Sequence, residues 1–344
     1  MLPDPSVNTE PNLPADLSDL GLLRSIQNRL HWSSRDKVAR AIAQATALRI
    51  GGVSSGDQDQ SVLAELCQRG ICRAPVAVTP TMCESVRTYF RNTPCYTAHV
   101  PAYSDGAARS VDEAAPVSHY GSYRLDQSLA APHLLELALN SRLLELIGGY
   151  LGCLPSLYSI NTFWTFPAAD AGLTHAYHRD EDDYRFVVVF VYWTDVEAGE
   201  GEFYYIEGTH DREWVEHRIR HSLWPLFYRL RGIRWVQNAE DLRHLNGGNG
   251  YGYDPVYRRL FGRHIRRFEG TAGTTIVTDT FGLHRGAPPG NRSRLCTWIR
   301  YGLYANEAYR IDKTEPAPAS LVRDRIGDDP ATRYITRLAL DWKR

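Results

Sequence analysis

The sequence lacks the features that mark membrane-spanning, disulfide-stapled and polyanion-binding proteins. No apolar run in its 344 residues approaches the roughly 20 residues that a membrane-spanning helix requires. Six cysteines are scattered without a CxxC pair, which disfavours zinc-finger and disulfide scaffolds and favours a location in the reducing cytoplasm. The formal net charge of −1 gives no reason to expect nucleic acid or an anionic membrane as a partner. The oligomeric state is left open.

What is present is the composition of an ordinary soluble globular protein, with 43% hydrophobic and 23% charged residues. A chain of this length can bury a sizeable core, and we expect a single main domain over residues 17–310. Residues 1–16 contain four prolines and neither a basic nor an apolar signal-peptide region, which is typical of a flexible leader. Residues 311–344 are predicted to form a tail with a helix near Tyr334–Lys343.

In the first half of the chain, apolar residues recur at helical spacing. Trp32-Ser33-Ser34 is expected to divide the first stretch into two helices, with Ser34 as an N-cap. Thr79-Pro80-Thr81 predicts the start of a later helix, and the leucines of Pro132–Leu151 predict another with one apolar face. The predicted helices cover residues 19–50, 61–69, 81–90 and 132–151.

Short strands separated by turns dominate the second half. Residues 211–270 depart from this pattern because arginines are interleaved with tryptophan, tyrosine and phenylalanine, and we interpret them as a largely helical insertion. Helices followed by many short strands predict an α+β fold with a closed or double-sheet β core. The predicted strands cover residues 71–78, 120–125, 157–166, 186–193, 203–206, 274–278 and 294–304.

One imidazole and one carboxylate stand a single residue apart in His178-Arg179-Asp180. Because side chains alternate along an extended strand, His178 and Asp180 can face the same way. His284 follows the strand at 274–278 and is the best candidate for a third ligand. Two histidines and one carboxylate, with other positions open, suit a non-haem Fe(II) that activates oxygen. His175 is expected to lie in the pocket rather than on the metal, and the acidic run 181–183 is expected to be a solvated loop.

Further motifs accompany this triad in a characteristic order. They are Leu63–Gly70 leading to Val86, Leu143–Gly152, Trp193–Val196, Gly201–His210, and His284-Arg285-Gly286 followed by Asn291–Arg294. In this order and spacing the chain resembles the phytanoyl-CoA dioxygenase family of Fe(II)- and 2-oxoglutarate-dependent oxygenases, over residues 60–305 without the insertion. The family's PGSH motif corresponds to Glu207-Gly208-Thr209-His210, which has lost the proline.

The resemblance implies a double-stranded β-helix, a jelly-roll or cupin-like core, with iron on its inner face. It also implies 2-oxoglutarate as cosubstrate and a basic residue after the distal histidine to pair with its far carboxylate. Arginine suits this role because its planar fork grips a carboxylate with two hydrogen bonds. Arg294 is our choice and Arg292 the runner-up. Asn161 and Trp164 fall where the family places side chains that line the cosubstrate pocket.

The predicted function is a dioxygenase that hydroxylates an unactivated C–H bond of a small molecule and releases succinate and carbon dioxide. Relatives that halogenate have a small residue at position 180, so Asp180 argues for hydroxylation. One alternative is a non-catalytic barrel that keeps the triad as a binding site. Another is a cupin-like zinc or manganese enzyme, which would leave the arginine unused. The sequence does not identify the substrate.

Overall fold

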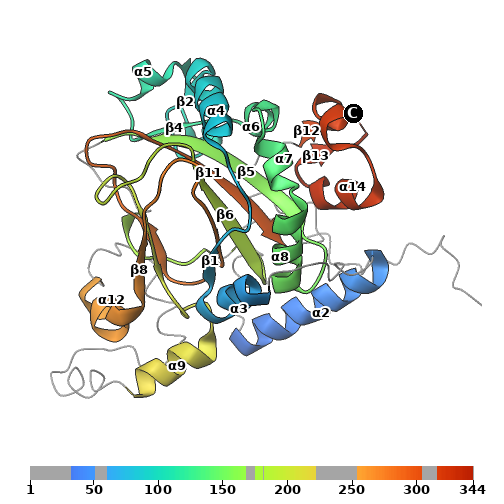
Figure 1. Ribbon diagram of the computed structural model, residues 1–344, viewed down its shortest axis with the longest axis vertical. Coiled ribbons are helices and arrows are strands. Elements are labelled where there is room, and N and C mark those ends of the chain that lie inside the picture. The colour runs from blue at the N-terminus through green and yellow to red at the C-terminus, as the bar shows by residue number, and fades with distance from the viewer. Residues whose placement is uncertain are drawn as a thin grey trace, which may run out of the picture.

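A computed structural model describes residues 32–50, 60–167, 175–180, 182–221, 254–303 and 316–343. It combines antiparallel sheets with helices, so the α+β prediction is confirmed (Figure 1). The predicted leader 1–16, the first predicted helix up to residue 31 and most of the predicted insertion lie outside the described residues. The division of the chain into a leader, a domain and a tail therefore stays a prediction.

The larger sheet has eight strands in the order β1-β9-β6-β11-β5-β4-β2-β3, and all of its neighbours pair antiparallel. Its central strand β11 places Trp298 opposite Asn161 on one side and Phe190 on the other. The strands are β1 (Ile71–Arg73), β2 (Cys95–Tyr96), β3 (Ala108–Arg109), β4 (Tyr120–Ser122), β5 (Ser156–Thr165), β6 (Phe186–Tyr192), β9 (Thr275–Thr278) and β11 (Arg294–Gly302).

A second sheet, called the smaller sheet below, has the order β10-β7-β8 and is also antiparallel, while a separate two-stranded sheet pairs β12 (Ala317–Pro318) with β13 (Leu340–Asp341) in parallel. Its middle strand pairs Tyr205 with His284 on one side and with Arg266 on the other. The strands are β7 (Phe203–Ile206), β8 (Ile265–Phe268) and β10 (His284–Gly286). The end of the segment predicted as a helical insertion is therefore a strand, because its backbone completes this sheet.

Helices cover one face of the larger sheet, where leucines of α6, α7 and α8 pack against alternate residues of β5, β6 and β11. The prediction of one helix over 132–151 is wrong. The chain turns at Leu139, and Asn140 starts a new helix by accepting a hydrogen bond from the Leu143 amide at 3.2 Å. The longer helices are α2 (Trp32–Ile50), α3 (Gln60–Arg69), α4 (Pro80–Asn92), α6 (Leu125–Ala130), α7 (Leu134–Ala138), α8 (Ser141–Leu151), α9 (Arg212–Arg220), α12 (Asp254–Phe261) and α14 (Pro330–Thr336).

The remaining described elements are short. They are η2 (Pro101–Tyr103), α5 (Val111–Ala114), η5 (Gly262–His264), β12 (Ala317–Pro318), η6 (Ala319–Leu321), α13 (Arg323–Ile326) and β13 (Leu340–Asp341). The tail helix α14 begins earlier than predicted, because Asp329 caps it ahead of Pro330.

Two hydrophobic cores follow from this arrangement. One lies between the helices and the larger sheet. The other contains inward-facing aromatic residues from both sheets, among them Phe163, Phe190 and Phe203. The strand β6 is buried along its whole length because it contributes alternate side chains to each core. The second core surrounds the cavity described below.

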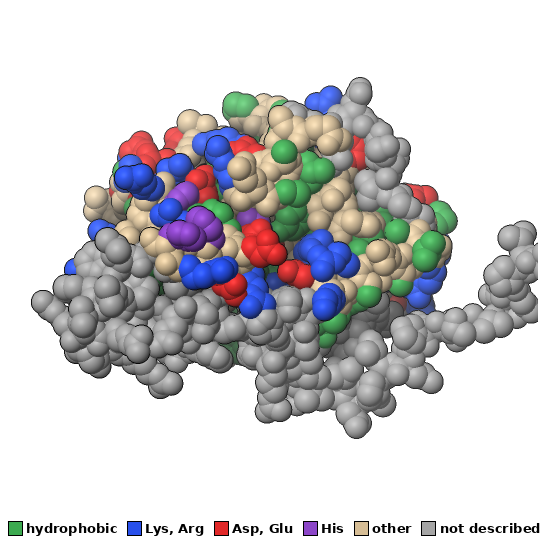
Figure 2. Space-filling view, turned by 90° about the horizontal axis from the view of Figure 1, so that it is seen from below, with side chains coloured by type: hydrophobic (Ala, Val, Ile, Leu, Met, Phe, Trp, Pro, Cys, Tyr) green, Lys and Arg blue, Asp and Glu red, His purple; other side chains and the backbone are tan. Residues whose placement is uncertain are grey.

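The described surface carries charges of both signs. In the view from below, Lys, Arg, Asp and Glu side chains of the described residues lie interspersed rather than gathered by sign (Figure 2). None of the described helices is both long and apolar enough to cross a membrane. All six cysteines are free thiols, and five are buried.

Candidate metal centre

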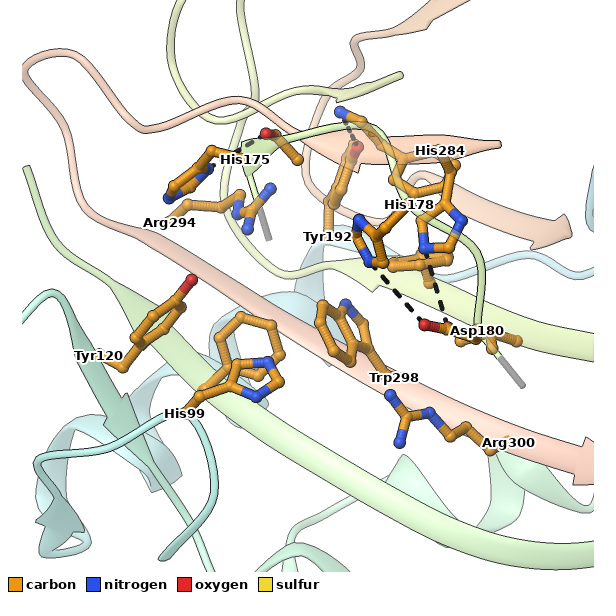
Figure 3. A pocket seen from close by; sticks show the side chains of 15 residues that line it. His99, Tyr120, His175, His178, Asp180, Tyr192, His284, Arg294, Trp298 and Arg300 are labelled. Atoms are coloured by element: carbon orange, nitrogen blue, oxygen red, sulfur yellow. Dashed lines mark hydrogen bonds and ion pairs between the residues drawn. The ribbon is translucent and has the colours of Figure 1, made fainter. Parts of the chain in front are cut away.

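A cavity of about 110 Å³ lies between the two sheets. A single water needs roughly 10–15 Å³ by the same measure, so the cavity can hold several small ligand groups. Both sheets contribute to its wall, with β4, β5, β6 and β11 on one side and β7 and β10 on the other. The residues that carry polar groups into it include His99, His175, His178, Asp180, His284, Arg294 and Arg300 (Figure 3).

The backbone brings His178, Asp180 and His284 together. His178 and His284 face each other in an antiparallel bridge, and each amide donates to the other's carbonyl at 2.9 and 3.0 Å. The Asp180 amide donates to the Thr280 carbonyl at 2.9 Å, which holds the next inward-facing residue beside the bridge. The ligand atoms of the three side chains lie within 4.8 Å of one another.

Both imidazoles are oriented by backbone carbonyls. Nδ1 of His178 lies 2.8 Å from the Ala176 oxygen, and Nδ1 of His284 lies 2.9 Å from the Gly282 oxygen. A neutral imidazole that donates from Nδ1 keeps the lone pair of Nε2 for a metal. The two Nε2 atoms lie 3.8 and 3.7 Å from the two carboxylate oxygens of Asp180, beyond hydrogen-bonding distance (Figure 3).

Electrostatics keep His284 and Asp180 in the protonation states that metal binding requires. Burial and the neighbouring His178 lower the pKa of His284 to about 4, against the opposing effect of Asp180. Burial alone would raise the pKa of Asp180, but His284, His178 and Arg300 together lower it. At neutral pH the site therefore offers a neutral His284 and an ionised carboxylate, the states that a divalent metal requires.

Arg179, between the two ligands, points the other way and anchors the segment. Its buried guanidinium donates to the carbonyl oxygens of Thr209, at 2.7 Å, and Phe281. It also lies over the Phe281 ring, 5.1 Å from the ring centre. Burial lowers the pKa of Arg179 to about 10, so it remains a cation at neutral pH. Arg179 thus ties the ligand-bearing segment to two loops of the smaller sheet.

Arg179→Met is expected to destabilise the metal-free protein by about 1–3 kcal/mol, because two buried carbonyls lose a charged donor. Thermal or denaturant unfolding measures this, with Arg91→Met as the control at an exposed ion pair. Equal unfolding curves for both variants would contradict the anchoring role.

Arg294 lies in the same cavity, at the end marked by His175 and Tyr192 (Figure 3). It is 7% exposed, its Nη2 lies 3.2 Å from the Thr165 hydroxyl, and its Nη1 donates to the Gly201 carbonyl. Gly201 has φ of +92°, and a Cβ there would lie 3.4 Å from the guanidinium. That distance is an ordinary van der Waals contact, so glycine at this turn suits the left-handed backbone conformation rather than a need for space.

The other predicted cosubstrate residues do not line the cavity. Arg292 precedes β11, is 59% exposed at its side chain and pairs with Glu197 at 2.8 Å. Trp164 packs in the helix-covered core, where its indole N–H donates to the Tyr123 hydroxyl at 3.0 Å. It faces away because Phe163, its neighbour on β5, faces the cavity and side chains alternate. Asn161 shares the strand face of Phe163 but does not line the cavity; it is 3% exposed and donates to the His99 carbonyl at 3.4 Å.

Several residues of the cavity are not marked by any pattern that was used to choose the candidates. His99, Tyr120, Tyr192 and Arg300 were not among the candidates, yet all four line it. The strand period places Arg300 on the same face as Arg294, which was a usable signal. His99 lies in a stretch without periodicity, so no sequence pattern indicated that it would line the cavity. His175 lines the cavity as predicted, with its Nδ1 3.1 Å from the Gly286 carbonyl.

The acidic run after Asp180 is not a solvated loop. Asp182 and Asp183 are 4% and 1% exposed, and Glu181 lies outside the described residues. Asp182 accepts from the Tyr158 hydroxyl at 3.1 Å and lies 3.7 Å from Nε of Arg300. Burial raises the pKa of Asp183 to about 7. Tertiary packing therefore overrides the polar sequence at this point.

The raised pKa of Asp183 predicts a pH dependence of stability. The folded protein holds a proton that the unfolded chain releases above its ordinary pKa of 3.8. The stabilisation is thus complete below that pH and is lost as pH rises through about 7. In Asp183→Asn, stability should fall less between pH 4 and pH 8 than in the wild type, as measured by denaturant unfolding. Exposed Asp112→Asn is the control, and parallel curves for Asp183→Asn and wild type would contradict the prediction.

Comparison with known proteins gives structural likenesses only. No family model matches the chain, and no curated protein matches it. The epimerase SnoN, solved with Fe³⁺, alpha-ketoglutarate and nogalamycin RO, is 15% identical over 79% of this chain and 92% of its own, with a TM-score of 0.44. The alpha-ketoglutarate-dependent carbocyclase SnoK is 12% identical over 72% of this chain and 84% of its own, with a TM-score of 0.43.

HygX from Streptomyces hygroscopicus, solved with nickel and 2-oxoglutarate, is 15% identical over 75% of this chain and 90% of its own, with a TM-score of 0.42. Each of these three structures is described as dependent on, or bound to, 2-oxoglutarate (alpha-ketoglutarate). The identities and TM-scores are too low to show the family of this chain.

Proposed function

We propose that this protein is an Fe(II)- and 2-oxoglutarate-dependent oxygenase of the phytanoyl-CoA dioxygenase type that hydroxylates a small molecule. The observation that carries the proposal is the convergence of two Nε2 atoms and one carboxylate in a buried cavity that also holds Arg294. A set of two histidines and one carboxylate leaves other metal positions open for cosubstrate and dioxygen. We also propose that the larger and smaller antiparallel sheets are the two halves of a double-stranded β-helix.

His178, Asp180 and His284 would hold the metal, and the carbonyls of Ala176 and Gly282 keep the two rings in place. When bound, Fe(II) with 2-oxoglutarate and dioxygen supplies the oxidation of an unactivated C–H bond, with release of succinate and carbon dioxide. The protein's own contribution is to bind, orient and exclude water.

Arg294 would receive the far carboxylate of 2-oxoglutarate. Burial removes competing water, and a charge-assisted pair in such a place is stronger than at the surface. The Gly201 carbonyl and the Thr165 hydroxyl hold its guanidinium in the wall before any ligand binds. Aromatic side chains around the cavity, including Phe163, Phe190 and Phe203, keep the site dry.

An anaerobic titration of the wild-type protein with Fe(II) and then 2-oxoglutarate tests the proposal. A weak visible charge-transfer band should appear when 2-oxoglutarate is added to the Fe(II)-loaded protein. It should stop growing at one equivalent of iron and one equivalent of 2-oxoglutarate per protein. Iron binding without that band would disprove the cosubstrate and leave a differently metallated enzyme or a binding protein. Tight binding of zinc or manganese with no effect of 2-oxoglutarate would favour that same alternative.

A further inference from the structure

The cavity holds a second buried cation, Arg300, which the cosubstrate does not need. Arg300 is 7% exposed and lies on the same face of β11 as Arg294, but toward the other end of the strand. Its charge acts on Asp180, whereas that of Arg294 acts on His175 and Tyr192. The two guanidinium groups therefore lie at opposite ends of the cavity, and Arg300 is the one beside the metal triad (Figure 3).

Neighbouring groups hold the guanidinium of Arg300 in place. Its Nε lies 3.7 Å from an oxygen of Asp182, and its carbon lies 5.2 Å from the centre of the Trp298 ring. Asp182 is itself positioned by the Tyr158 hydroxyl at 3.1 Å. The group extends along the cavity beneath Trp298, in the direction of His99 (Figure 3). An arginine oriented in this way presents a planar fork that suits a carboxylate or a similar oxyanion.

His99 provides a second, independent sign of a ligand at this end. Its ring lies 5.1, 5.4 and 5.0 Å from the rings of Tyr120, Phe163 and Trp298, which together form an aromatic wall. Its Nε2 is buried and has no hydrogen-bond partner among the described residues. Burial and the charge of Arg300 lower the pKa of His99 to about 4, so the ring is neutral at physiological pH. A buried polar atom without a partner is costly, and a bound ligand would satisfy it.

We propose that Arg300, His99 and Trp298 form a subsite that binds an anionic group of the primary substrate beside the metal triad. The substrate would be a small organic anion with a planar or apolar body, because the wall around the subsite is aromatic. The assignment of this subsite to the substrate rests on the proposed function, in which Arg294 binds the cosubstrate. Arg300 would then place the substrate next to Asp180, where the oxidation occurs.

A purely structural role is the competing explanation, in which Arg300 only neutralises Asp182. The two explanations differ in what a small anion does. Sodium benzoate has a carboxylate on a planar ring, and benzamide has nearly the same shape without the charge. Isothermal titration of each into the full-length, metal-free protein should show benzoate binding at least about tenfold tighter, a difference of about 1.4 kcal/mol. This comparison needs no variant, and equal affinities would overturn the subsite.

Two variants then locate the binding. Arg300→Gln should remove the preference for benzoate, whereas Arg294→Gln should keep it. The reverse pattern would overturn the proposal. Thermal unfolding checks that Arg300→Gln is folded, and Arg300→Lys is the fallback that keeps the charge beside Asp182 but loses the planar fork. Its benzoate affinity should fall between those of the wild type and Arg300→Gln.

A further titration separates this inference from the proposed function. With Fe(II) and saturating 2-oxoglutarate under anaerobic conditions, benzoate should still bind, because the two anions occupy opposite ends. If 2-oxoglutarate fails to bind but the Arg300-dependent preference persists, the oxygenase assignment falls and the anion subsite remains. If 2-oxoglutarate displaces benzoate competitively, the subsite as a separate place is overturned while the oxygenase assignment stands.

Discussion

His178→Ala is expected to abolish stoichiometric binding of Fe(II), with an affinity loss of at least about 100-fold. Loss of an outer partner of a metal ligand typically costs about 10–100-fold, and loss of the ligand itself should cost more. The remaining Asp180 and His284 would then face each other across 3.7 Å without the third donor. Isothermal titration of the metal-free protein with Fe(II) under anaerobic conditions measures the change.

The control for this experiment is His221→Ala, which removes an exposed histidine near the end of α9. Asp180→Asn provides a second variant that keeps the shape of the side chain and removes its charge. It should also lose Fe(II) binding, because an amide is a poor substitute for an ionised carboxylate. Unchanged affinity in either variant would show that iron binds elsewhere.

Arg294→Gln should weaken 2-oxoglutarate binding by roughly 30-fold or more while leaving Fe(II) binding intact. The reason is that removal of one partner from a buried charge pair costs about 2–5 kcal/mol. The charge-transfer titration measures 2-oxoglutarate binding, and a separate isothermal titration with Fe(II) alone measures iron binding, because the band needs both components. Arg294→Lys should recover part of the affinity, because it restores the charge without the two-pronged geometry.

The matched control is Arg292→Gln, which removes the same functional group two positions earlier. Arg292 is exposed and paired with Glu197, so 2-oxoglutarate binding should change less than about twofold, as expected for a surface ion pair. A large loss in Arg292→Gln would restore the runner-up anchor. A large loss in Arg300→Gln, with Arg294→Gln unaffected, would move the cosubstrate to the other end of the cavity.

The sequence by itself was sufficient for the features that depend on local pattern. The apolar run of β6, the two-residue period of His178 and Asp180, and the cap at Thr79 predicted elements that the structure contains. The order of motifs was sufficient to pair that segment with His284, far along the chain. Within β11 the two-residue period also places Arg294 and Arg300 on one face.

Only the tertiary structure decided which of these side chains meet in the cavity. The two-residue strand period indicates that neighbouring side chains face opposite ways, but it does not indicate which face the helices cover. Trp164 was therefore assigned to the cavity side, whereas it packs in the helix-covered core. It also does not say where a strand begins, and Arg292 lies before β11 and remains in solvent.

The same limit applies to burial and to long-range contacts. Asp182 and Asp183 form part of a polar sequence, yet both are buried. Arg300 and Tyr158 contact Asp182 from distant parts of the chain. The amide of Tyr184 donates to Asp183 within the turn. His99 enters the cavity from a stretch without periodicity. The sequence thus predicted the three candidate metal ligands through local period and motif order, and the structure brings these side chains together. The packing of the two sheets determined which residues lie at each end of the cavity, because this placement depends on contacts between residues far apart in the chain.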